Sequence, residues 1–255
     1  MSEPYLLVQN VSKSFPGVKA LDSVSLAVSA GECHALVGEN GAGKSTLMKI
    51  LSGAVLPDAG EIFLAGGMTV IDSPLAARRS GVSMIYQELN LLPELTVAEN
   101  IFLGREPRRR FGLLDRRRMN EESRRWLARL HQDIDPRRST RELSLAEQQM
   151  VEIVKALSLE ARVLIMDEPS AILTDRELEE LFQLIATLKK DGLAIIYISH
   201  RLEEIFRICD RVTVMRDGRT VSTRPVSEAA HGQLVREMVG RELAQVFPPR
   251  KDSQD

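Results

Sequence analysis

The hydrophobic positions divide the chain into zones that differ in period. In the first third, short runs of β-branched and aliphatic residues, which are typical of strands, occupy residues 5–8, 24–28, 33–37, 61–64 and 82–86. Over residues 88–159 the apolar residues instead recur at helical spacing, most clearly in 119–132 and 145–157. The pattern predicts a strand-rich beginning followed by a helical segment.

The last third alternates between strand and helix patterns, in the order strand 163–166, helix 175–190, strand 193–199, a helix that begins near residue 202, and strand 211–215. Strands that are apolar throughout and separated by helices form parallel sheets buried on both faces. We therefore expect a core made of residues 1–87 and 160–240, with a helical insertion at 88–159. Residues 241–255 have the composition of a tail or linker.

Residues 38–45 carry the most specific motif of the chain. They fit the pattern G-x-x-x-x-G-K-[ST], follow the predicted strand 33–37 and precede a helical pattern. Glycines allow backbone N–H groups to point at phosphate oxygens, Lys44 adds a positive charge, and Ser45 offers a hydroxyl to Mg²⁺. This context favours a nucleoside triphosphate site over an ordinary glycine-rich turn. The residues expected around the phosphates are Gly38, Glu39, Asn40, Gly41, Ala42, Gly43, Lys44, Ser45 and Thr46.

Polar side chains follow three other predicted strands. Asp167 and Glu168 end strand 163–166, His200 follows strand 193–199, and Gln87 follows strand 82–86. Because carboxyl ends of parallel strands face the ligand crevice, these residues should lie beside the glycine loop. Asp167 suits Mg²⁺ coordination, and Glu168 suits polarisation of the attacking water. His200 is placed to sense a γ-phosphate, and Gln87 to contact Mg²⁺ or water and to link the site to the insertion. A solvated turn is the structural alternative for the two acids.

Two S/T-x-x-E patterns predict capping boxes at helix starts. Ser144 and Glu147 would begin the helix 145–157, and Thr174 and Glu177 would begin the helix 175–190. Capping is a sufficient structural explanation for all four residues. His34, His131 and His231 are likewise interpreted as structural.

The arginines at 108–110 and 116–118 form the one conspicuous basic stretch. Only Phe111 and Trp126 are aromatic nearby, and acidic residues such as Asp115 dilute the positive charge. The stretch therefore favours a solvated helical face or a docking surface over a nucleic-acid groove.

Composition narrows the class of protein. The 255 residues are 44% hydrophobic and 27% charged with a net charge of −2, which is ordinary for a globular domain and gives no global attraction to nucleic acid or anionic lipid. The N-terminus lacks a signal-peptide pattern, and the apolar runs are strand-sized. We expect a cytoplasmic protein that reaches a membrane only through a partner. Cys33 and Cys209 are then reduced, buried residues, with a disulfide as the less favoured alternative.

Taken in order, the motifs resemble the nucleotide-binding domain of an ATP-binding cassette (ABC) transporter. The resemblance implies a P-loop NTPase fold of class α/β, with a mainly parallel sheet core, an N-terminal antiparallel β-subdomain and an inserted helical subdomain. It implies ATP and Mg²⁺ as cofactors. Each motif matches the family in position: residues 38–45 the Walker A, Gln87 the Q-loop, Ser144 and its neighbours the signature, Asp167-Glu168 the Walker B with the catalytic glutamate, His200 the switch histidine, and Phe15 the aromatic that stacks on adenine.

Residues 15–21, 87–91, 147–153 and 198–202 narrow the resemblance to bacterial monosaccharide importers of the ribose, galactose and xylose type. Their ATPase subunit usually carries two such domains, and this chain resembles the N-terminal one. The implied partners are a second nucleotide-binding domain, transmembrane permease subunits and, through them, a periplasmic sugar-binding protein, with no nucleic acid. The implied location is the inner face of the plasma membrane. The alternative is a soluble ABC-type ATPase that acts on ribosomes or nucleic acid.

Two departures from the family pattern affect the expected activity. Leu145-Ala146-Glu147 stands where the signature has Gly-Gly-Gln, and Thr174 replaces the usual D-loop aspartate. Both elements serve a site whose Walker A lies on the opposite domain, and in the resembled importers that Walker A is often degenerate as well. The intact Walker A of this chain would then face a good signature on the opposite domain. Two copies of this chain alone could only combine a good Walker A with the altered signature, so we expect weak ATPase activity from the isolated chain.

Overall fold

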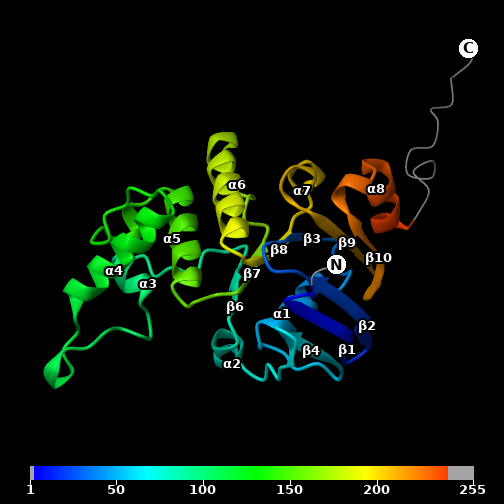
Figure 1. The fold of residues 1–255 in the computed structure, drawn as a ribbon, viewed down its shortest axis with the longest axis horizontal. Helices are drawn as coiled ribbons and strands as arrows, with labels where there is room; N and C mark the ends of the chain where they lie inside the picture. The colour runs from blue at the N-terminus through cyan, green and yellow to red at the C-terminus, as the bar shows by residue number, and fades with distance from the viewer. Residues whose placement is uncertain (1–2, 241–255) are drawn as a thin grey trace, which may run out of the picture.

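The computed structural model describes residues 3–240, in which two β-sheets lie together and helices flank them (Figure 1). The smaller sheet is antiparallel in the order β2-β1-β4-β5. Its strands are β1 (Leu6–Phe15), β2 (Val18–Val28), β4 (Ala59–Leu64) and β5 (Gly67–Met68). The larger sheet has the order β10-β9-β3-β8-β7-β6 and is parallel except for β10. Its strands are β3 (Cys33–Val37), β6 (Val82–Ile85), β7 (Val163–Asp167), β8 (Ala194–Ile198), β9 (Arg211–Arg216) and β10 (Arg219–Pro225).

Eight α-helices connect and cover the strands over residues 3–240. They are α1 (Lys44–Leu51), α2 (Pro74–Arg79), α3 (Val97–Ile101), α4 (Arg116–Arg129), α5 (Leu145–Leu157), α6 (Asp175–Lys190), α7 (Leu202–Ile208) and α8 (His231–Val239). Figure 1 shows α3, α4 and α5 grouped on one side of the molecule, away from the antiparallel sheet. None of these helices is both long and apolar enough to cross a membrane.

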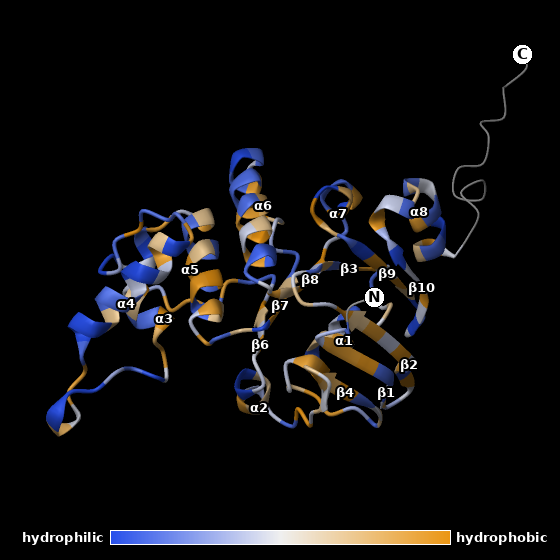
Figure 2. Cartoon of the chain, in the orientation of Figure 1, coloured by the Kyte–Doolittle hydropathy of each residue, from blue (hydrophilic) through white to orange (hydrophobic). Residues whose placement is uncertain are grey.

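The larger sheet separates two hydrophobic cores. On β3 all five side chains are buried, and alternate residues face opposite sides because the side-chain period of a strand is two. Leu36 packs in the core that contains α1 and the antiparallel sheet, whereas Ala35 and Val37 pack in the core that contains α3 to α8. Figure 2 shows the corresponding hydrophobic residues on the sheets and on the inner faces of the helices. The sheet therefore holds the loop after β3 between two packed layers.

The expected α/β fold with a mainly parallel core, an antiparallel sheet and helices in the middle of the chain is confirmed. Several element boundaries differ. β1 and β2 are much longer than the strands predicted at 5–8 and 24–28, because register shifts between Val8 and Ser14 break the alternation that marks a strand. α4 begins three residues early, since Asp115 caps it by accepting from the Arg118 N–H at 3.2 Å. α2, α3, α8 and β10 were not predicted.

The subdivision of the core and insertion at 1–87, 88–159 and 160–240 remains a prediction, and the predicted tail at 241–255 lies outside the described residues. Two interpretations of buried residues are confirmed. Cys33 and Cys209 are buried free thiols whose sulfurs lie 3.5 Å apart. His34 is buried, with its ring nitrogens 2.7 Å from Glu32 Oε1 and 2.7 Å from Thr213 Oγ1, as expected for a structural histidine.

Candidate functional site

The loop between β3 and α1 is built around glycines that pack tightly against the rest of the domain. A Cβ on Gly38 would lie 2.3 Å from the Met215 carbonyl oxygen, and one on Gly43 would lie 2.7 Å from the Ala20 carbonyl oxygen. Gly43 is also the N-cap of α1, with φ of 101° and no side-chain cap. The first N–H groups of α1 are therefore free of a side-chain partner, which is the arrangement that binds phosphate.

Lys44 lies at the start of α1 and folds back over this loop. Its Nζ donates to the Gly38 carbonyl at 2.6 Å and to the Glu39 carbonyl at 3.0 Å. Burial lowers the pKa of Lys44, and the negative charges of Asp167 and Glu168 oppose that shift. The ammonium group is thus half-buried and electrostatically coupled to the acids at the end of β7.

The structure brings Lys44, Asp167, Glu168 and His200 together, as expected for residues at the carboxyl ends of parallel strands. Asp167 ends β7, and Glu168 follows with a φ of 49° and donates its N–H to the Ile198 carbonyl at 2.9 Å. Burial raises the pKa of Asp167, the charge of Glu168 raises it further, and Lys44 opposes both. His200 Nδ1 lies 3.1 Å from Glu168 Oε1. The arrangement combines a cation, two carboxylates and an imidazole beside a helix N-terminus.

A pocket of about 730 Å³ opens in front of the start of α1. Phe15, at the end of β1, contributes a ring that is 39% exposed to one wall, as expected of an aromatic that stacks on a base. The pocket is lined by Phe15, Val18, Lys19, Ala20, Asn40, Gly41, Gly43, Lys44, Ser45, Thr46, Asp217 and Gly218.

The turn at Asp217-Gly218 was missed as part of this pocket. Gly218 donates its N–H to the Ala42 carbonyl at 3.2 Å and accepts from the Asp22 N–H at 2.8 Å, so it ties the glycine loop to β2. An Asp-Gly pair between two apolar runs is a recognisable hairpin signal. Its position beside the loop depends on β9 pairing with β3, which the local sequence does not indicate.

Gln87 and Ser144 are not joined to this cluster. Gln87 is exposed two residues beyond β6, and its side chain makes no hydrogen bond to the residues that the structure describes. Ser144 caps α5: its N–H donates to Glu147 Oε2 at 2.7 Å, and its Oγ accepts from the Glu147 N–H at 3.2 Å. The predicted capping box is confirmed, as is the one at Thr174. In Figure 1, α5 lies well apart from α1, with β6 to β8 between them.

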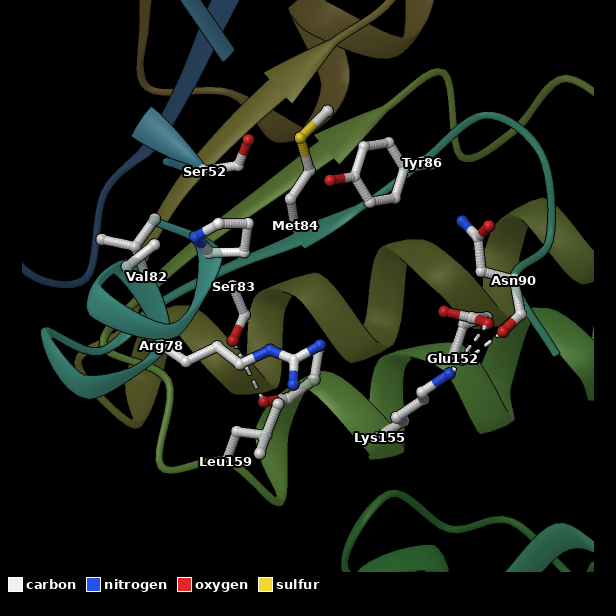
Figure 3. A pocket seen from close by; sticks show the side chains of 13 residues that line it. Ser52, Arg78, Val82, Ser83, Met84, Tyr86, Asn90, Glu152, Lys155 and Leu159 are labelled. Atoms are coloured by element: carbon white, nitrogen blue, oxygen red, sulfur yellow. Dashed lines mark hydrogen bonds and ion pairs between the residues drawn. The ribbon is translucent and has the colours of Figure 1, made fainter. Parts of the chain in front are cut away.

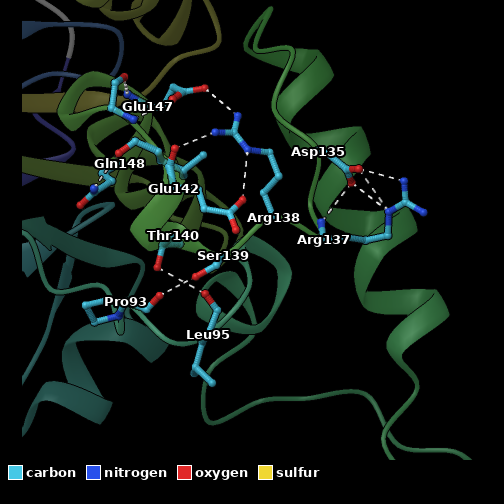
Figure 4. A network of polar contacts seen from close by, with 12 residues as sticks. Pro93, Leu95, Asp135, Arg137, Arg138, Ser139, Thr140, Glu142, Glu147 and Gln148 are labelled. Atoms are coloured by element: carbon cyan, nitrogen blue, oxygen red, sulfur yellow. Dashed lines mark hydrogen bonds and ion pairs between the residues drawn. The ribbon is translucent and has the colours of Figure 1, made fainter.

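A polar network connects the cap of α5 to the segment that follows Gln87 (Figure 4). Arg138 Nη1 donates to Glu147 Oε1 at 3.2 Å, and the neighbouring Ser139 Oγ donates to the Pro93 carbonyl at 2.7 Å. No local sequence pattern indicates this role of Arg138. The network therefore ties the start of α5 to the loop that precedes α3.

A second pocket of about 140 Å³ lies between α2, β6 and α5, next to the residues around Gln87 (Figure 3). Glu152 is only 7% exposed there, and its Oε1 has no hydrogen-bond partner among residues 3–240. Burial raises the pKa of Glu152, although Lys155 opposes the shift. Arg78 and Tyr86 also line the pocket.

The donor set beside the loop fits Mg²⁺. Residues 3–240 hold no cluster of three or more His, Cys, Asp or Glu side chains suited to a metal. Mg²⁺ is commonly held by one or two protein oxygens, with phosphates and water as its other ligands. The hydroxyl of Ser45 and the carboxylate of Asp167 are hard oxygen donors of that kind.

A glycine loop between a buried strand and an uncapped helix N-terminus, with an acid pair at a nearby strand end, defines a P-loop nucleotide-binding domain. The sequence profile of the family described as "ABC transporter" matches residues 21–171. The chain therefore belongs to the ABC transporter family.

Relatives and solved structures agree with this family. The chain is 54% identical to "Ribose import ATP-binding protein RbsA 3" of Rubrobacter xylanophilus, over 96% of this chain and 50% of that protein. It is 53% identical to "Ribose import ATP-binding protein RbsA" of Chromobacterium violaceum, over 96% and 49% of the two chains. It thus spans about half the length of the curated relatives it matches. The structure of MJ1267 in its ADP conformation, described as an ATP-binding cassette of an ABC transporter, superposes with a TM-score of 0.80 at 26% identity, covering 94% of this chain and 100% of that one.

Proposed function

We propose that this chain is an ATP-binding and hydrolysing cassette, the N-terminal one of its subunit, that energises import of a monosaccharide. The observation that carries the ATPase proposal is the convergence of Lys44 with Asp167, Glu168 and His200 at the N-terminus of α1. The names of the relatives support a monosaccharide as the transported substrate. They give no support to an action on ribosomes or nucleic acid.

ATP binding is proposed to use the glycine loop and the aromatic ring of Phe15 in the same pocket. Backbone N–H groups of residues 38–46 and the Lys44 ammonium bind the phosphates of ATP, while Phe15 stacks on the base. Lys44 must exchange the carbonyls of Gly38 and Glu39 for phosphate oxygens. Ser45 and Asp167 are the residues that would hold Mg²⁺, which neutralises phosphate charge when it is bound. Gln87, two residues beyond β6, would join them only after a movement of that segment.

Hydrolysis depends on the acid after β7. Glu168 orients a water molecule for in-line attack on the γ-phosphorus, so that its carboxylate accepts a hydrogen bond from that water. His200 already contacts Glu168, and it holds the carboxylate in place while its ring faces the position of the γ-phosphate. Ser144 does not face this loop, so the proposed second half of the site is the corresponding signature of another nucleotide-binding domain.

The pocket in Figure 3 is the proposed docking site of the permease. The pocket lies between α5 and the segment around Gln87, so a permease segment bound there would contact the helical insertion and lie next to a proposed residue of the ATP site. Glu152 Oε1 has no hydrogen-bond partner among residues 3–240 and faces only the ammonium group of Lys155, at 3.8 Å, so it can still accept a hydrogen bond from a donor on the partner. Through the permease, the cassette would lie at the inner face of the plasma membrane and respond to a periplasmic sugar-binding protein.

ATP binding to matched variants tests the first part of the proposal. Lys44→Ala removes the proposed phosphate ligand, whereas Lys49→Ala removes an exposed lysine from the last turn of the same helix. Titration with a fluorescent ATP analogue should show at least a tenfold loss of affinity for Lys44→Ala and no change for Lys49→Ala. Equal affinities for the two variants would show that the loop does not bind the phosphates as proposed.

Transport is tested with the complete subunit. Reconstituted with its permease in vesicles, it should hydrolyse ATP faster when a sugar-loaded binding protein is added, and Glu152→Gln should weaken its association with the permease. If none of the sugars tested stimulates ATP hydrolysis, the importer proposal is contradicted, whereas the ATPase proposal is unaffected.

A further inference from the structure

The segment between α3 and α4 projects from the molecule as a short hairpin, residues 107–115. Pro107 accepts from the Asp115 N–H at 2.8 Å, and Arg109 donates its N–H to the Leu113 carbonyl at 2.7 Å. Figure 1 shows this green segment extending to the lower left, farther from the sheets than α4. The hairpin is anchored at its base, where Arg105 donates to the Ser158 carbonyl at 2.8 Å and to the Ile101 carbonyl at 2.7 Å. The projection is therefore an ordered element with its own hydrogen bonds.

Its tip exposes large apolar side chains. Phe111 is 93% exposed, the highest value for a large hydrophobic residue over residues 3–240, and Leu113 and Leu114 are 67% and 43% exposed. Figure 2 shows hydrophobic and hydrophilic residues side by side at this tip. Exposed apolar residues gathered at one convex tip are typical of an interaction site.

The same tip is strongly basic. Residues 105–118 contain seven arginines and two acidic residues. Arg109, Arg117 and Arg118 form ion pairs with nearby carboxylates. Arg108 and Arg110 have no carboxylate partner among the described residues, and the Arg110 guanidinium lies 6.0 Å from the centre of the Phe111 ring. Arg108 Nη1 donates to the Gly112 carbonyl at 3.0 Å, which keeps its charge at the tip. Aromatic and leucine side chains beside arginines without a carboxylate partner are typical of an element that binds the membrane interface.

We infer that the hairpin 107–115 binds the anionic surface of a phospholipid bilayer. Phe111 and Leu113 enter the headgroup region, and Arg108 and Arg110 contact anionic headgroups. A permease is a poorer partner for this tip, because short cytoplasmic loops of membrane proteins carry an excess of Lys and Arg and would repel it. A single-stranded nucleic acid is also poorer, since one exposed aromatic ring offers little stacking surface.

The inference uses none of the residues of the ATP site. It adds a direct lipid contact to the proposed docking on a permease, and it can fail while the proposed ATPase function stands. Conversely, loss of ATP binding in the Lys44 variant would leave the lipid contact untouched.

Flotation of the chain with vesicles tests it. The vesicles are of phosphatidylcholine alone or with about one-third phosphatidylglycerol, at low and high salt. Binding should require the anionic lipid and weaken with salt. Arg108→Gln with Arg110→Gln should reduce partitioning about 30-fold, or about fivefold for each arginine, which corresponds to about 1 kcal/mol each. Phe111→Ser with Leu113→Ser should also abolish flotation.

Two control variants keep the comparison specific. Met68→Ser with Val70→Ser alters side chains that are 65% and 70% exposed elsewhere on the surface. Arg176→Gln removes an arginine whose side chain is 90% exposed on α6. Both controls should float like the unaltered chain.

A fluorescence measurement gives an independent readout of insertion. The double variant Phe111→Trp with Trp126→Phe keeps the tip apolar. It also places the single tryptophan of the chain at position 111. Its emission should shift to the blue with anionic vesicles and stay unchanged with neutral ones.

Three results would overturn the inference. One is no flotation of the unaltered chain with anionic vesicles, together with no spectral shift. Another is equal loss of flotation in the hairpin and control variants. The third is unchanged flotation of the hairpin variants accompanied by lost binding to detergent-solubilised permease or to RNA, which would assign the hairpin to that partner instead.

Discussion

Gly41 and Gly43 form a matched pair that tests how the phosphate loop is packed. Both have positive φ, 87° and 101°, yet a Cβ on Gly41 would meet nothing within 4 Å. A Cβ on Gly43 would lie 2.7 Å from the Ala20 carbonyl oxygen and 2.8 Å from Leu21 Cδ2. Alanine at either position adds backbone strain of about 1–2 kcal/mol, partly offset by about 0.5–1 kcal/mol of lost freedom in the unfolded chain.

The contact with β2 adds a second cost at Gly43 alone. Overpacking of this kind costs about 1–3 kcal/mol, so we expect Gly41→Ala to lower the free energy of unfolding by about 1 kcal/mol and Gly43→Ala by about 3 kcal/mol. Urea unfolding followed by circular dichroism measures both. Equal losses in the two variants would show that the loop does not pack against Ala20 and Leu21 in this way.

Three further predictions concern titration and capping. Burial raises the pKa of Glu152 above its ordinary value of 4.5, so the free energy of unfolding should fall as the pH rises from that value through the raised pKa. Urea unfolding should show a smaller decline in Glu152→Gln than in the unaltered chain, because Asp167, whose pKa is also raised, keeps its own contribution. Identical pH profiles would contradict this. Burial lowers the pKa of Lys44, so the chain's affinity for an ATP analogue should fall at a lower pH than expected for a lysine with an ordinary pKa. In a fluorescence titration, Lys44→Arg should make this affinity less dependent on pH. Ser144→Ala and Thr96→Ala, which remove the capping boxes of α5 and α3, should each destabilise the fold by about 1 kcal/mol. In analytical ultracentrifugation only Ser144→Ala should weaken ATP-driven pairing of domains, and equal effects on pairing would remove Ser144 from the site.

Much of the nucleotide site could be predicted because its residues follow from local sequence and strand order. The glycine motif specifies its own loop and helix start, and the carboxyl ends of parallel strands meet at one edge of a sheet. Asp167, Glu168 and His200 could thus be placed beside Lys44 from the order of apolar runs alone. Phe15 was predicted only through the family resemblance.

Other features depend on long-range packing that local patterns do not report. The turn at Gly218 belongs to the pocket because β9 pairs with β3. The network of Arg138 joins segments more than forty residues apart along the chain, as in the contact of Ser139 with Pro93. The long hairpin of β1 and β2 was predicted too short, since its bulges interrupt the period of two by which strands are recognised.

The most direct test of the account is the hydrolysis of ATP by a Glu168→Gln variant. Single-turnover measurement with labelled ATP is suited to the slow reaction expected of the isolated chain. Glu203→Gln, which alters a carboxylate that is 83% exposed, is the matched control. We expect Glu168→Gln to bind ATP as tightly as the unaltered chain and to hydrolyse it at least about 100-fold more slowly, while the control hydrolyses it normally. Unchanged hydrolysis by Glu168→Gln would contradict the assignment of this residue and of the catalytic site around it.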